Sequence, residues 1–102
     1  MRYSSKSAVE YELNQHYLLR KLYQAKRTEL SVYEGFRIKE INQRKSRAFY
    51  SLKRAGESRY KYVGAASSPD IQYVRELNFY KEMLRVIENN IRIMEEFLGT
   101  YR

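Results

Sequence analysis

The chain has 102 residues, no cysteine and a formal net charge of +8, which predicts one domain without disulfide bonds or thiolate metal sites. No apolar run reaches the roughly 20 residues that a membrane-spanning helix needs. Aromatic residues make up 15% of the chain, which is too many for a disordered protein, and we expect a soluble cytoplasmic protein.

The first predicted element is a helix over residues 6–33. Apolar residues repeat every seven positions along one of its faces, with Leu22 between the second and the third: Tyr11, Leu18, Ala25 and Val32. This spacing is typical of an amphipathic helix. Because a helix of this length needs tertiary packing to be stable in water, we expect this face to pack against the last helix of the chain, in antiparallel orientation.

The middle segment, residues 35–64, contains three short runs that alternate apolar or aromatic residues with basic ones. In a strand, successive side chains point to opposite faces. One face would then be apolar, with Phe36, Ile38, Ala48, Tyr50, Leu52, Tyr60 and Tyr62. The other face would be basic, with Arg37, Lys39, Arg47, Phe49, Ser51, Lys53, Arg59 and Lys61. This sorting predicts a three-stranded antiparallel meander, and a helical or irregular connection is the alternative.

The last predicted element is a helix over residues 68–100. Ser68, Pro69 and Asp70 form a typical helix start, with a capping residue, a first-turn proline and an acid near the positive end of the helix dipole. Apolar residues then follow at alternating steps of four and three: Tyr73, Leu77, Tyr80, Leu84, Ile87, Ile91, Met94, Leu98 and Tyr101. This pattern predicts a coiled-coil-like seam.

Together these elements predict a mainly α fold of the α+β class. We expect a single domain over residues 1–102, with two long antiparallel helices that form a coiled-coil-like hairpin and a small three-stranded antiparallel meander at its tip. Two helices with such apolar seams leave one side uncovered. A homodimer through the helix seams is therefore one further expectation.

The positive charge is concentrated in the middle of the chain, where residues 35–67 carry nine basic and two acidic residues. A concentrated basic surface indicates an acidic partner. Nucleic acid, DNA above all, is the first interpretation, an acidic protein surface is the second, and a merely solvated sheet face is the third. The candidate contact residues are Arg37, Lys39, Arg47, Phe49, Lys53, Arg54, Arg59 and Lys61.

No recognisable catalytic, cofactor or metal motif occurs in the sequence. His16 is the only histidine and there is no cysteine, so the chain offers no second histidine or cysteine ligand to complete a metal site. The eleven tyrosines could stack on bases, but most lie at seam positions or on the expected apolar sheet face, which favours core packing. We therefore expect a protein that is not an enzyme and that uses no cofactor.

Four stretches carry a resemblance to known proteins: residues 35–39, 49–52, 59–64 and 68–69. In this order they resemble uncharacterised bacterial and phage proteins with a helix, three strands and a second helix. They also resemble the arm-type DNA-binding domain of phage and transposon integrases. The integrase resemblance implies that the sheet enters the major groove through Arg37, Lys39, Arg47, Lys53, Arg59 and Lys61. An alternative function is a protein-interaction module, such as a coiled-coil adaptor or a phage-type inhibitor of a host protein that processes nucleic acid.

Overall fold

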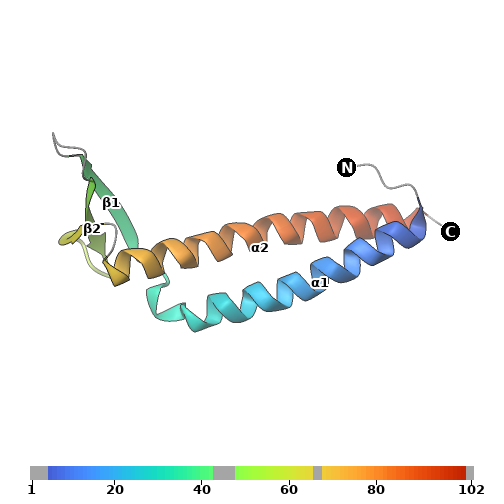
Figure 1. The fold of residues 1–102 in the computed structure, drawn as a ribbon, viewed down its shortest axis with the longest axis horizontal. Coiled ribbons are helices and arrows are strands. Elements are labelled where there is room, and N and C mark those ends of the chain that lie inside the picture. The colour runs from blue at the N-terminus through green and yellow to red at the C-terminus, as the bar shows by residue number, and fades with distance from the viewer. Residues whose placement is uncertain (1–4, 43–47, 66–67, 101–102) are drawn as a thin grey trace. The chain divides into compact units, whose positions relative to one another are not determined.

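The computed structural model describes residues 5–42, 48–65 and 68–100, without the side chains of Asn42 and Ala48. Along the chain a long helix is followed by a three-stranded sheet and a second long helix, which confirms the predicted α+β class and the meander (Figure 1). The elements are α1 (Lys6–Glu29), the short 3-10 helix η1 (Ser31–Tyr33), β1 (Arg37–Asn42), β2 (Ala48–Lys53), β3 (Lys61–Ala65) and α2 (Pro69–Gly99). The helical alternative for the middle segment is therefore wrong for its described residues.

The chain divides into two compact units, and each is described by itself. The helix-pair unit consists of Met1–Lys26 and Tyr80–Arg102, and the sheet unit consists of Arg27–Phe79. The element boundaries lie within a few residues of the predicted ones. The largest difference is at the end of the first helix, where α1 ends at Glu29 and the chain tightens into η1.

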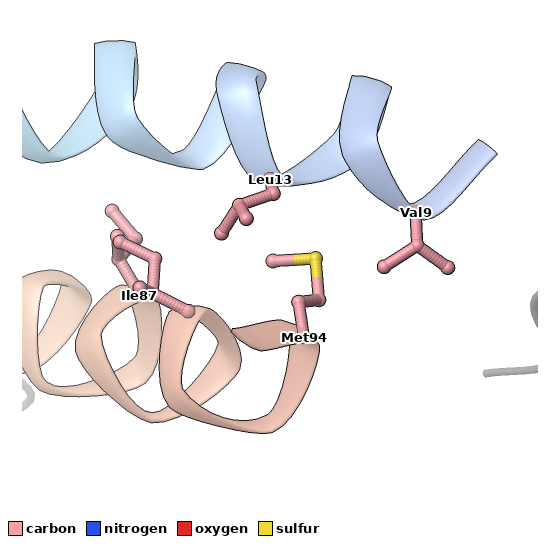
Figure 2. Packing of buried hydrophobic residues seen from close by; sticks show 5 residues of the cluster. Val9, Leu13, Ile87 and Met94 are labelled. Atoms are coloured by element: carbon pink, nitrogen blue, oxygen red, sulfur yellow. The ribbon is translucent and has the colours of Figure 1, made fainter. Parts of the chain in front are cut away.

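The helix-pair unit is held together by an apolar cluster between α1 and α2. Val9 and Leu13 of α1 form one buried cluster with Ile87, Ile91 and Met94 of α2. Figure 2 labels four of these side chains: Val9, Leu13, Ile87 and Met94. All five side chains are buried, and removing their apolar surface from water is the main favourable term for pairing the two helices.

Polar contacts continue the same interface and show that the two helices run antiparallel. Nδ2 of Asn90 lies 3.3 Å from Nε2 of His16, and the guanidinium of Arg20 lies 3.5 Å from the carboxylate of Glu88. Farther along, the rings of Tyr23 and Tyr80 lie 5.6 Å apart between centroids. Residue numbers rise along α1 as they fall along α2, so the predicted antiparallel orientation is confirmed.

The structure corrects the predicted packing face of α1. The heptad residues expected in the interface are exposed, together with Leu22: Tyr11, Leu18, Ala25 and Val32. Leu18, for example, is 64% exposed, whereas Val9 is fully buried. The packing face instead consists of Val9 and Leu13, with Tyr17 and Tyr23 packed against the same cluster, and Val9, Leu13 and Tyr17 lie outside the heptad.

The predicted seam of α2 is largely confirmed. Five of its members are buried: Leu77, Leu84, Ile87, Ile91 and Met94. Tyr73 is 44% exposed, so this position of the expected seam is wrong, and Tyr101 lies outside the described residues. Ile71 and Val74, which the heptad did not include, are fully buried near the start of the helix.

The sheet of this unit is a meander in the order β1-β2-β3. Tyr50 and Leu52 of β2 are buried, as the alternating pattern predicted. Nη2 of Arg75 on α2 donates a hydrogen bond of 2.6 Å to Oη of Tyr50, and its guanidinium lies 4.6 Å from the centre of the tyrosine ring. Near the start of α2, Tyr33 donates a hydrogen bond to Asp70, with 3.3 Å between the oxygens.

Candidate nucleic-acid interface

The strands β1 and β2 bring most of the predicted basic face together. Their antiparallel register pairs Arg37 with Lys53, Lys39 with Ser51 and Ile41 with Phe49. Residues that lie directly opposite each other in such a pair share one face of the sheet. Three cationic side chains and one phenylalanine therefore lie on the face opposite to the buried Tyr50 and Leu52.

The register of β3 contains an irregularity that the sequence analysis did not foresee. Tyr50 pairs with Gly64, but the next residue of β2, Ser51, pairs with Tyr62, so that Val63 is an extra residue on β3. Such a bulge shifts the alternation of side chains in one strand. Gly64 has a φ of +101°, a conformation that glycine adopts without the penalty of other residues.

This bulge exchanges the faces of the residues that precede it in β3. Tyr62 lies opposite Ser51 and therefore shares a face with Lys39 and Phe49. The prediction that Tyr60 and Tyr62 lie on the apolar face is wrong: they are 40% and 62% exposed, respectively. Lys61 lies opposite Leu52 instead, so its predicted position on the basic face is also wrong.

The aromatic rings and the cations of this face lie close together. The centroids of the Phe49 and Tyr62 rings are 6.1 Å apart. Nζ of Lys39 lies 5.9 Å from the centre of the Tyr60 ring, and Nζ of Lys53 lies 5.6 Å from it. These distances are within reach of cation–π attraction. We call this surface the aromatic–cation face and define it by Arg37, Lys39, Phe49, Lys53, Tyr60 and Tyr62.

The remaining predicted contact residues lie elsewhere. Arg54 and Arg59 are exposed in the connection between β2 and β3, and Lys61 forms an ion pair of 3.9 Å with Glu57. Arg47 lies outside the described residues. Of the eight candidates, the structure thus brings four together on the face: Arg37, Lys39, Phe49 and Lys53.

Tyr60 and Tyr62 are the site residues that sequence reasoning missed. A signal for them was present, because an isolated glycine inside a strand pattern indicates a bulge. Gly64 follows Tyr62 and Val63 in the third run. A bulge at this glycine would have placed the two tyrosines beside the basic residues.

The aromatic–cation face carries no acidic residue among the described parts of the strands. Glu40 lies opposite Tyr50 and hence on the other face, and Glu57 lies in the β2–β3 connection. The charges of Arg37, Lys39 and Lys53 are therefore not neutralised by carboxylates within their own rows of the sheet. Lysine and arginine in such a setting attract phosphate groups.

Neither a metal centre nor a membrane span is found in the described part of the chain. Within residues 5–42, 48–65 and 68–100, no three His, Cys, Asp or Glu side chains gather in a way that could hold a metal ion. No helix in these ranges is long and apolar enough to cross a membrane.

No protein family, curated protein or solved structure matches this chain. The resemblance to integrase arm domains stays a prediction, since no relative bears on it. What the aromatic–cation face binds is therefore inferred from its own residues.

Proposed function

We propose that this chain is a non-enzymatic cytoplasmic protein that binds nucleic acid through the aromatic–cation face. The observation that supports this proposal is the grouping of three cations on one sheet face, with no carboxylate on that face among the described residues of the strands. Arg37 and Lys53 are paired across β1 and β2, and Lys39 lies in the next row on the same face. Exposed rings among them offer base contacts in addition to phosphate contacts.

The electrostatic part of such binding has a quantitative signature. Each phosphate that a lysine or arginine neutralises releases condensed counterions, so affinity falls as salt rises. If all three cations of the face contact a duplex, the slope of log K against log salt is roughly −3, and for a single strand it is roughly −2. The exposed arginines of the β2–β3 connection would make either slope steeper.

The test is a binding titration of the chain across a salt series, with DNA and RNA oligonucleotides in single-stranded and duplex form. The double variant Lys39→Glu, Lys53→Glu should bind more weakly and lose about two units of slope on a duplex. The matched control Lys6→Glu, Lys21→Glu makes the same change of net charge at exposed positions of α1 and should keep the parent slope. If both double variants bind like the parent, the face is not the contact surface.

A protein-interaction module is the second candidate function, as an adaptor or as an inhibitor of a protein that processes nucleic acid. The exposed apolar residues of α1, Tyr11, Leu18 and Leu22, favour it, because clustered exposed apolar residues mark interaction sites. This function predicts no appreciable affinity for any oligonucleotide at low salt. It also predicts a protein complex that survives nuclease treatment and is lost in the variant Leu18→Glu, Leu22→Glu, which changes the exposed apolar residues that support this candidate.

A homodimer through the helices is proposed on the same exposed residues. Leu18 and Leu22 are 64% and 51% exposed on α1, and a second copy of the chain would remove them from water. Sedimentation equilibrium should then give twice the chain mass of 12.4 kDa. The variant Leu18→Glu, Leu22→Glu should sediment as a monomer with its helical circular dichroism unchanged, and a parent that is already monomeric contradicts the dimer.

A further inference from the structure

We infer that the preferred ligand of the aromatic–cation face is a single-stranded segment of DNA or RNA, with its bases stacked on Tyr62 and Phe49. This inference rests on the proposed function and adds the class of nucleic acid. It departs from the integrase resemblance, which implies a duplex with the sheet in its major groove. The bulge in β3 is the structural reason, because it turns Tyr62 toward the side of the sheet that carries the cations.

The stacking surface consists of two neighbouring rings. Tyr62 is 62% exposed, Phe49 is half-buried, and their planes differ by 35° at a centroid separation of 6.1 Å. Every base has a π-face, so exposed rings bind single strands with little dependence on sequence. In a duplex the faces of the bases are already stacked on each other, and the two rings would find no partner there.

Tyr60 has a different role, which is to position the charged side chains of two lysines. Its ring lies within 6 Å of the ammonium groups of both Lys39 and Lys53, and this attraction holds two flexible side chains near one place. We therefore treat Tyr60 as a positioning residue for the two lysines. Tyr62 and Phe49, for which no cation–π contact is found among the described side chains, are the rings on which bases stack.

The rows of the sheet place these parts in an order that suits a nucleotide chain. Arg37 and Lys53 form one row, Lys39, Ser51 and Tyr62 form the next, and Ile41, Phe49 and Ala65 form the third. The cations thus lie in the first two rows and the stacking rings in the last two, with Lys39 and Tyr62 in the shared middle row. A single strand has a comparable division, with phosphates along one side and unpaired bases along the other.

The test uses the absence of tryptophan from the chain. Tyr62→Trp gives the protein a single indole on the face, and the control Tyr11→Trp places one on α1, where the tyrosine is 63% exposed. A thymidine oligonucleotide should quench the emission of the first variant and leave that of the second unchanged. Equal quenching of both variants, or none in the first while the oligonucleotide is bound, overturns the stacking.

Affinity measurements separate this inference from the proposed function. Tyr62→Ala should weaken the binding of a single-stranded oligonucleotide roughly 5- to 150-fold, the range for one stacked base, and leave duplex binding unchanged. Tyr62→Trp should restore the affinity, which excludes a folding defect as the cause. An abasic oligonucleotide with the same phosphates should bind the parent and Tyr62→Ala equally.

The two failures look different. If the chain binds duplex and single strand alike and Tyr62→Ala alters neither, the function stands and the single-strand preference is wrong. If no oligonucleotide binds at low salt, both are wrong. A higher affinity for DNA than for RNA, or the reverse, identifies which of the two nucleic acids supplies the single strand.

Discussion

The two long helices carry similar apolar patterns, but the structure uses them differently. The heptad of α2 faces inward, with Leu84, Ile87 and Ile91 buried, whereas the heptad of α1 faces outward, with Tyr11 and Leu18 exposed. The difference shows that a regular apolar spacing identifies a helix and one of its faces. It does not show that this face is the one that packs within the chain.

The packing face of α1 is less regular in its apolar spacing than the exposed heptad. On α1, the packing face holds only Val9 and Leu13 as buried side chains and continues with residues that make polar contacts. Tyr17 donates a hydrogen bond of 3.0 Å to Glu95, and Arg20 pairs with Glu88. Tyr17 and Tyr23 also pack against the apolar cluster, so the buried face of α1 combines apolar packing with these polar contacts, and Val9, Leu13 and Tyr17 lie outside the regular heptad of Tyr11 and Leu18.

The largest expected effect tests the packing face of α2 with two isoleucines of the same helix. Ile91 is 3% exposed and Ile93 is 47% exposed. Replacing Ile91 by Ala should lower the free energy of unfolding by about 2–5 kcal/mol, since it removes buried methyl groups and leaves a cavity. Ile93→Ala should change it by about 0.5 kcal/mol or less. Urea denaturation measures both, and equal losses would mean that α2 buries two faces.

A smaller effect tests, with two leucines, whether the heptad face of α1 is the exposed one. Leu13 is 8% exposed and packs against α2, whereas Leu18 is 64% exposed. Leu13→Ala should cost about 2 kcal/mol, at the lower end of the range because the site borders solvent. Leu18→Ala should cost about 0.5 kcal/mol or less at concentrations where the chain is monomeric. The reverse order of the two losses would restore the heptad as the packing face.

The smallest effect concerns the polar side of the helix pair and appears only at high pH. Partial burial and the hydrogen bond to Glu95 raise the pKa of Tyr17 above its ordinary value of 10.0. The folded chain then holds this proton more tightly than the unfolded chain does. The stability that Tyr17 contributes is therefore complete below about pH 10 and is lost as pH rises through the raised pKa.

The variant Tyr17→Phe has no such proton, and its stability should fall less than that of the parent between about pH 9 and pH 11. Tyr11→Phe is the matched control, because Tyr11 lies on the exposed stripe of the same helix. It should follow the parent curve. Denaturant titrations at each pH give the free energy of unfolding of all three proteins. Parallel curves would contradict a contribution of the Tyr17–Glu95 hydrogen bond to stability.

The sequence by itself determined the secondary-structure elements and the packing face of α2, but not that of α1. Ser68, Pro69 and Asp70 marked the start of α2, and the alternation in the middle segment marked the strands, because caps, prolines and period-two patterns act over a few residues. Of the candidate site, Arg37, Lys39, Phe49 and Lys53 could be assigned to one face, since they lie in two strands with regular alternation.

Only the tertiary structure decided which face of α1 is buried and which face of the sheet the tyrosines of the third run occupy. The first depends on Ile87, Ile91 and Met94, residues that lie near α1 only after the chain has folded back. The second depends on one extra residue, Val63, in the pairing of β3 with β2. A shift of one residue moves every side chain of a strand to the other face of the sheet. The pairing between strands fixes this shift, and the spacing of residues within one strand does not.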